Sequence, residues 1–163
     1  MDVAVSMTRK SRGGPAKAAV VGSSLMGMIS GTAVANVLTT GTISIPLMKR
    51  AGYKPSVAGA VEAVASTGGQ LMPPIMGAAA FLMADIMEVP YLEITKSALL
   101  PAILFYIAVF WAVHLEALKA GLKPLGNFEV PDVVNSLRNN GHVLLAIPVF
   151  IGALVSGYSV MYS

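Results

Sequence analysis

Four hydrophobic blocks divide the chain, and clusters of charged residues separate them. They cover residues 18–48, 55–84, 97–115 and 143–163. A helix of about 20 apolar residues crosses the roughly 30 Å hydrocarbon core of a bilayer. The last two blocks have about that length, so they predict ordinary transmembrane helices. The first two blocks are longer and irregular, and they need separate interpretations.

The first block, residues 18–48, has a length that suits neither one membrane span nor two. As one straight helix it would be roughly 46 Å long, which exceeds the thickness of the hydrocarbon core. Two full spans need about 40 residues and a turn. A re-entrant helical hairpin, which enters the membrane, turns near mid-depth and leaves on the same side, fits this length. We expect the turn within "SGTAVAN", residues 30–36.

Basic residues lie on both sides of this block. They are Arg9, Lys10, Arg12 and Lys17 before it, and Lys49, Arg50 and Lys54 after it. The positive-inside rule favours a cytoplasmic location for both groups, and a hairpin places both on that side. We therefore expect residues 1–17 to be a basic cytoplasmic lead-in. By the same rule, residues 126–142 are expected to form a cytoplasmic loop before a last transmembrane helix at 143–163.

The second block is interrupted by helix-breaking residues. "STGGQLMPPIMG" places Gly68–Gly69 and Pro73–Pro74 in its middle. Paired glycines loosen a helix, and each proline removes a backbone donor and clashes with the preceding turn. Two short helices joined by extended backbone are expected here. Lipid does not tolerate exposed polar backbone, so the break must face protein or a water-filled cavity.

The composition agrees with a membrane protein and excludes several kinds of chemistry. Charged residues make up 12% of the 163 residues, about half of the roughly 25% typical of soluble domains. The chain contains no cysteine, and its two histidines lie far apart. An intramembrane enzyme needs a nucleophile with a base, a metal set or an acid pair, which Glu62 and His114 do not make. We expect an all-α integral membrane protein in a lipid bilayer, neither an enzyme nor a nucleic-acid-binding protein.

Small polar residues in the first block indicate an ion site. Half-helix ends and unwound carbonyls coordinate cations at mid-membrane depth in secondary transporters. Serine, threonine and asparagine supply further neutral oxygen ligands, which suit sodium. We expect the polar groups of residues 29–42 to line such a site together with the broken helix.

Simpler roles stay open for several of these residues. Gly27 and Gly31 have the small-xxx-small spacing that lets helices pack closely. Glu62 either reaches the membrane interface, meets an ion partner or takes part in coupling. The threonine hydroxyls that follow the turn can instead satisfy carbonyls of their own helix: Thr39, Thr40 and Thr42.

The motifs resemble a known family. "RGG", "ISGTAVAN", "IPLMKRAGY" and "STGGQLMPPIMG" follow one another in the order and spacing of the large membrane subunit of TRAP (tripartite ATP-independent periplasmic) transporters. The continuation "VPYLEITKSALLPAILFYIAVFWAVHLEALKAGLKPL" resembles the TAXI branch, in which the small and large subunits are often fused. The resemblance covers residues 8–125, and we expect residues 18–125 to belong to the transport core.

The resemblance implies an elevator-type, sodium-driven secondary transporter, with sodium as coupling ion and no other cofactor. A periplasmic binding protein would deliver an organic anion, typically a carboxylate, at the inner membrane of a bacterium or archaeon. The large subunit of this family has two inverted repeats, each with a hairpin and a broken helix that help to form sodium sites. Carried onto this chain, the hairpin tip is Ser30, Gly31, Thr32, Ala33 and Asn36, and the broken helix contributes Thr67, Gly68, Gly69, Pro73 and Pro74.

The chain departs from the family pattern in three respects. Many members have aspartate at the position of Asn36, and serine often follows the second proline, where this chain has Ile75. Only one copy of each motif is present, so we expect a fragment that is half of an inverted-repeat transporter. Its partners would be the remaining half of the large subunit and a small membrane subunit or its fused equivalent. The alternative is a non-transporting scaffold or channel-like subunit whose helix breaks serve packing.

Overall fold

A computed structural model describes Thr8, residues 11–122 and Gly152. The helices in this part are α2 (Gly14–Ser30), α3 (Ala33–Arg50), α4 (Pro55–Gly68), a 3₁₀ turn η1 (Gly69–Leu71), α5 (Ala78–Met87) and α6 (Tyr91–Lys119). The expected all-α fold is confirmed for these residues. The predicted loop at 126–142 and, except for Gly152, the predicted last helix at 143–163 lie outside them.

Helices α2 and α3 form a helical hairpin with a two-residue turn. Gly13 precedes helix α2 and Gly31 follows it, and both glycines have a left-handed φ, of 71° and 61°, which other residues rarely adopt. Thr32 caps α3, because its hydroxyl accepts a hydrogen bond of 3.3 Å from the backbone N–H of Ala35. The turn therefore falls where the sequence predicts it. Its re-entrant position in a membrane stays a prediction.

The second hydrophobic block is broken, as its glycines and prolines predict. Helix α4 ends at Gly68, and regular α-helix resumes only at Ala78. The Gly77 N–H donates to the Gln70 carbonyl at 2.8 Å across the break. The first residue of α6 supports it from the side, because the Tyr91 hydroxyl donates to the carbonyls of Pro74, at 3.1 Å, and Ile75.

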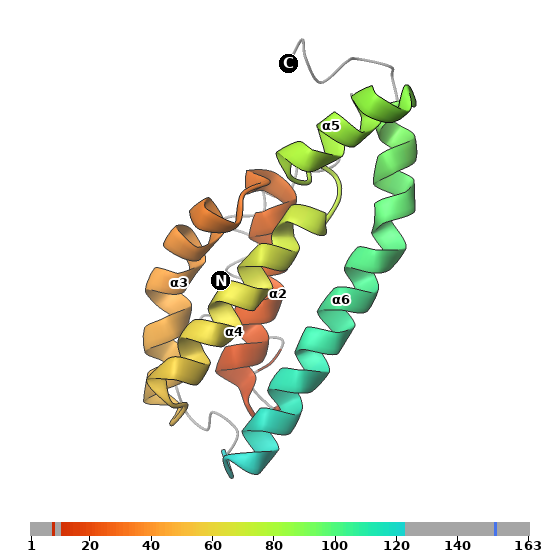
Figure 1. The fold of residues 1–163 in the computed structure, drawn as a ribbon. Helices are drawn as coiled ribbons and strands as arrows, with labels where there is room; N and C mark the ends of the chain where they lie inside the picture. The colour runs from red at the N-terminus through yellow and green to blue at the C-terminus, as the bar shows by residue number, and fades with distance from the viewer. Residues whose placement is uncertain (1–7, 9–10, 123–151, 153–163) are drawn as a thin grey trace.

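Helices α2, α3 and α4 pack against one another, and α6 runs beside α2 and α4 (Figure 1). Helix α5 continues from the break and meets the first turns of α6, where Phe81 stacks on Tyr91. Small residues let these helices approach closely. The buried apolar cluster consists of Ala16, Ala19, Val20, Met48, Tyr53, Ala58, Ala65, Val109, Val113 and Ala117.

Helix α6 is the one helix in the described part that is long and apolar enough to cross a membrane. It covers the predicted span at 97–115 and extends beyond it at both ends. Many of its large apolar side chains are exposed: Leu99, Leu100, Ile103, Leu104, Ile107, Trp111 and Leu115. A surface of this kind suits lipid or another apolar protein face.

The start of α2 differs from the prediction. The helix begins at Gly14, four residues before the expected block, and Lys17 is only 3% exposed. Its ammonium group bonds the Ser11 hydroxyl, lies 2.9 Å from His114 Nδ1 and stands 5.1 Å above the centroid of the Phe110 ring. Lys17 therefore joins α2 to α6 inside the protein and is not an exposed residue of the basic lead-in.

Tyr53, in the loop between α3 and α4, closes the same end of the bundle. Its hydroxyl donates to the Gly13 carbonyl at 3.5 Å, where α2 begins. Burial, aided by the nearby Glu116 carboxylate, raises the pKa of Tyr53 to about 12. The phenol therefore keeps its proton at neutral pH and remains a donor.

Candidate functional site

The hairpin turn packs directly into the break of the second block. A Cβ on Gly27 would lie 2.3 Å from the Cα of Gly69, and a Cβ on Gly31 would lie 2.3 Å from the Met76 carbonyl oxygen. Backbone therefore touches backbone at both points, and only glycine leaves enough room. The close packing expected from the Gly27–Gly31 spacing is present, and it brings the two irregular segments of the chain together. We call this region the hairpin–break contact.

Asn36 is the best-placed of the predicted site residues. Its side chain is fully buried, and Nδ2 donates to the Ser23 carbonyl at 2.8 Å. The same nitrogen lies 2.9 Å from the position that a Gly69 Cβ would take. Asn36 thus links α3 to both α2 and the start of the break. Sequence analysis placed it in the hairpin tip, and the structure places it one turn inside α3.

Of the other predicted residues, some lie at the hairpin–break contact and some face other parts of the protein. Ser30 lies at the turn, where its hydroxyl donates to the Thr32 carbonyl at 3.4 Å, and the Thr32 side chain is exposed. Pro73 is half-buried within the break. Gly68 faces another element, because a Cβ there would lie 2.1 Å from the Phe105 ring of α6.

Thr67 is the predicted residue whose side chain does not reach the hairpin. Its hydroxyl is exposed and donates to the Ala63 carbonyl of its own helix at 2.7 Å. Any part that it takes in binding an ion is therefore through its backbone carbonyl.

Glu62 forms a second polar centre, which sequence analysis did not foresee. Its side chain is fully buried, so of the alternatives left open, the one in which it reaches the membrane interface is wrong. Its hydrogen-bond partners are hydroxyl groups, and no cationic partner occurs among the described residues. We call this group the hydroxyl cage. It consists of Glu62 with Ser23, Thr40, Ser44 and Ser66.

The cage is built from three helices. Ser23 of α2 lies 3.2 Å from Glu62 Oε1, and Ser66, one turn along α4, lies 3.1 Å from the same oxygen. Thr40 of α3 also bonds Oε1, and Ser44 bonds Oε2. Gly41 leaves space for the glutamate stem, since a Cβ there would lie 3.2 Å from Glu62 Cγ.

A weak sequence signal for the cage exists. Thr40 and Ser44, like Glu62 and Ser66, are four residues apart and so lie on one face of their helices. The interpretation of the threonines as groups that satisfy their own helix is confirmed. Thr39 donates to the Ala35 carbonyl at 2.8 Å, and Thr42 donates to the Thr39 carbonyl at 3.1 Å. Thr40 does so too, but it also contacts Glu62.

Asn36 connects the cage to the hairpin–break contact. The Thr40 hydroxyl lies 2.7 Å from the Asn36 carbonyl, and the Asn36 amide donates to the carbonyl of Ser23. Both Thr40 and Ser23 carry hydroxyls of the cage. The Thr40 hydroxyl also lies 3.4 Å from Asn36 Oδ1, so the Asn36 side chain joins the break to the cage.

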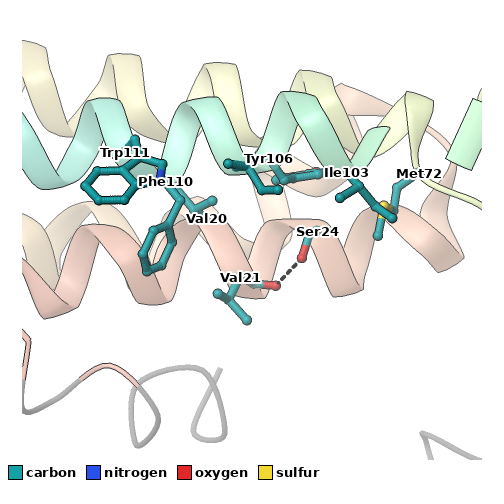
Figure 2. Close-up of a pocket in the computed structure, with 9 residues that line it drawn as sticks. Val20, Val21, Ser24, Met72, Ile103, Tyr106, Phe110 and Trp111 are labelled. Atoms are coloured by element: carbon teal, nitrogen blue, oxygen red, sulfur yellow. Dashed lines mark hydrogen bonds between the residues drawn. The ribbon is translucent and has the colours of Figure 1, made fainter. Parts of the chain in front are cut away.

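A cavity of about 300 Å³ between α2 and α6 is a different kind of site (Figure 2). Val20, Ile103, Phe110 and Trp111 form part of its wall. Its serine, Ser24, donates to the Val21 carbonyl at 2.8 Å. The lining is mainly apolar and suits hydrocarbon better than an ion or an organic anion.

A hairpin packed into a broken helix, beside a long apolar helix, is typical of a transport domain of a secondary transporter. The comparison with protein families names the class more closely. Residues 1–162 match the family described as tripartite ATP-independent periplasmic transporter, DctM component. The chain belongs to this family, the large permease component of TRAP transporters. Its assignment to the TAXI branch stays a prediction.

Three curated relatives share sequence with the chain. They are the uncharacterized protein y4mL of Sinorhizobium fredii, 31% identical over 71% of this chain, and the C4-dicarboxylate TRAP transporter large permease protein DctM of Pseudomonas aeruginosa, 27% identical over 90%. The uncharacterized protein YgiK of Salmonella typhimurium is 24% identical over 96%. The matches cover 28%, 34% and 36% of these relatives, so the chain spans about a third of their length. No solved structure matches the chain significantly.

Proposed function

We propose that this chain is part of a sodium-coupled TRAP permease that imports an organic anion, most simply a carboxylate. The family supports transport, and the Pseudomonas relative is named for C4-dicarboxylates. The observation that carries the proposal is the hairpin–break contact, where Gly27 meets Gly69 and Gly31 meets Met76. Two irregular segments of a membrane transporter are there joined in one polar region.

The ends of four helices explain how this region would serve both ions. Helices α2 and α4 end there, and their terminal carbonyls and the negative ends of their dipoles favour a cation. Helices α3 and α5 begin there, and their positive ends favour an anion. The proposed sodium ligands are the side chains of Ser30, Thr32 and Asn36 with carbonyls near residues 67–69. Gly31, Gly68 and Pro73 would shape the backbone around them.

The proposal includes partners and a location. A periplasmic substrate-binding protein would deliver the anion. A small membrane subunit or a fused equivalent, together with the remaining half of the large subunit, would complete the permease in the cytoplasmic membrane of a bacterium or archaeon. The exposed apolar face of α6 supports contact with lipid or with such a partner.

The competing function is a membrane scaffold or channel-like subunit whose breaks serve packing. The same glycine contacts would serve such a role, so only transport itself separates the two. The experiment uses the full-length transporter with its binding protein in proteoliposomes, supplied with labelled C4-dicarboxylates and other carboxylates. An inward sodium gradient should drive accumulation, and an equal potassium gradient should not. Uptake that is the same with and without a sodium gradient would refute sodium coupling. The absence of uptake for every carboxylate would favour the scaffold.

A further inference from the structure

We propose that the hydroxyl cage is a proton-binding site, with Glu62 as the group that takes up and releases the proton. This inference rests on the proposed transport function and adds a second coupling ion to it. It starts from hydrogen counting around the buried carboxylate. The cage makes seven hydroxyl contacts, but its four hydroxyl groups supply one hydrogen each.

The contacts of Thr40 show most clearly that the hydroxyl hydrogens are too few for all the contacts. Its hydroxyl oxygen lies within hydrogen-bond distance of two acceptors, the Asn36 carbonyl at 2.7 Å and Glu62 Oε1. One hydroxyl has one hydrogen, so it satisfies only one of them. A hydrogen on Oε1 supplies the other bond, because it is donated to Thr40 while Thr40 donates to Asn36. Both Thr40 contacts can therefore be hydrogen bonds at the same time when Glu62 carries a proton.

Within the part of the chain that the structure describes, no other charge neutralises the carboxylate. Glu62 is the only charged residue of α4, and the charged residues of α2 and α3 are Lys17, Lys49 and Arg50. Lys17 contacts Ser11 and His114 instead, and the other two are exposed at the end of α3. From α6, Tyr106 approaches this region and donates to the Ala65 carbonyl at 2.9 Å.

Because Glu62 is fully buried, its charge has to be neutralised, either by a metal ion or by a proton. An isolated charge removed from water is strongly destabilised, so buried charges are paired or neutralised. The hydroxyls of Thr40 and Ser44 bond the carboxylate directly, so the cage has no gap for a metal ion between these groups. A proton needs no such gap. Its binding forms one O–H bond on Glu62, with the proton taken from water on one face and returned to water on the other.

Asn36 couples the protonation of Glu62 to the hairpin–break contact. Its backbone carbonyl and Oδ1 accept from the Thr40 hydroxyl. Its Nδ2 donates to the Ser23 backbone carbonyl and lies beside the break at Gly69. Loss of the Glu62 proton changes which bonds Thr40 can donate. That change is passed to Asn36, and through it to the hairpin–break contact.

The test is a two-by-two measurement on the full-length transporter with its binding protein in proteoliposomes. Substrate accumulation is driven by a sodium gradient, by an inward proton gradient, by both or by neither. Wild type, Glu62→Gln and the matched control Glu93→Gln, at an exposed glutamate of α6, are compared. We expect Glu62→Gln to lose proton-driven accumulation while substrate exchange at equilibrium and the sodium response persist, and Glu93→Gln to behave as wild type.

Each outcome decides between the two proposals. If a proton gradient does not change substrate accumulation by the wild-type transporter, the proton site is refuted, whatever the sodium response. A transporter driven by protons alone refutes sodium coupling and leaves the site intact. If Glu62→Gln keeps proton-driven accumulation but binds sodium more weakly, the cage holds sodium and the proton proposal fails.

A second measurement covers the case in which Glu62→Gln does not fold. Infrared difference spectra of the wild-type transporter, taken across a pH titration with and without isotopically labelled glutamate, report the C=O stretch of a protonated carboxyl group. Ser44→Ala, which removes a hydrogen-bond partner of Glu62, should change the frequency of a labelled band. Absence of any labelled, titrating carboxyl band would overturn the proposal.

Discussion

The hairpin–break contact and the hydroxyl cage lie side by side but are held together differently. In the contact, backbone meets backbone, as where a Cβ on Gly27 would come within 2.3 Å of Gly69. In the cage, the long side chain of Glu62 crosses between helices to reach the hydroxyls. The first depends on the absence of side chains, and the second depends on particular ones.

This difference has a functional consequence. A contact between backbones can coordinate an ion through carbonyls, which are always present and carry no titratable charge. A cage of side chains around a carboxylate can change its protonation and its hydrogen bonds. The two regions therefore suit two different ions, and the Asn36 side chain touches both, through Nδ2 at Gly69 and Oδ1 at the Thr40 hydroxyl.

The largest effect is expected from filling the backbone contact. Gly27→Ala should reduce transport to background, because its methyl group would meet the backbone of Gly69, which cannot move aside as a side chain would. Gly59→Ala is the matched control, since a Cβ there meets nothing within 4 Å, and alanine favours helix by about 1 kcal/mol. Uptake and thermal unfolding of both variants are measured in the full-length transporter. Normal uptake by Gly27→Ala would show that the contact is not needed.

Asn36→Leu should have the next largest effect, because it removes the side-chain amide that contacts Ser23, Thr40 and the break at Gly69. A lost buried polar partner costs about 1–3 kcal/mol, which corresponds to a roughly five- to hundredfold higher sodium concentration at half-maximal uptake. Thr32→Val should raise this concentration less, because Thr32 is exposed and its hydroxyl already serves as a helix cap. Equal sodium dependence in both variants and the wild type would exclude these two side chains as ligands and leave Ser30 and the backbone carbonyls.

Loss of one hydroxyl from the cage should affect stability more than rate. Ser44→Ala leaves Glu62 Oε2 without its partner, and this should lower the free energy of unfolding by about 1–3 kcal/mol. Ser56→Ala, at an exposed serine near the start of α4, should change it by less than about 0.5 kcal/mol. Thermal unfolding of the purified protein in detergent measures both. Similar unfolding temperatures for the two variants would mean that the cage does not hold the helices together.

The same comparison explains what the sequence could predict. The hairpin turn and the break follow from local signals, because glycine and proline constrain the backbone wherever the rest of the chain lies. The cage does not, because Ser23, Thr40 and Glu62 come from three helices and meet only through their packing. The burial of Lys17 was missed for a similar reason. Its partner His114 lies on α6, 97 residues away.

Residues within the predicted site show the same limit. From the sequence, the neighbours Thr67 and Gly68 are both predicted to belong to the broken helix and to the ion site. In the structure the Thr67 side chain is exposed, and Gly68 packs against Phe105. Helical phase decides which side faces the hairpin, and phase near a break cannot be read from glycine and proline alone.

The central claim is that α2 and α3 form a hairpin that enters and leaves the membrane on one side, so that its turn meets the break at depth. The chain contains no cysteine, so single cysteines at Arg12, Lys54 and Glu88, all exposed, can be placed in the full-length transporter after replacement of any others. A membrane-impermeant thiol reagent is then added to intact cells. Arg12→Cys and Lys54→Cys should both be protected until the cells are opened, and Glu88→Cys should react from outside. Labelling of either Arg12→Cys or Lys54→Cys alone in intact cells would contradict the hairpin, because the two ends would then lie on opposite faces.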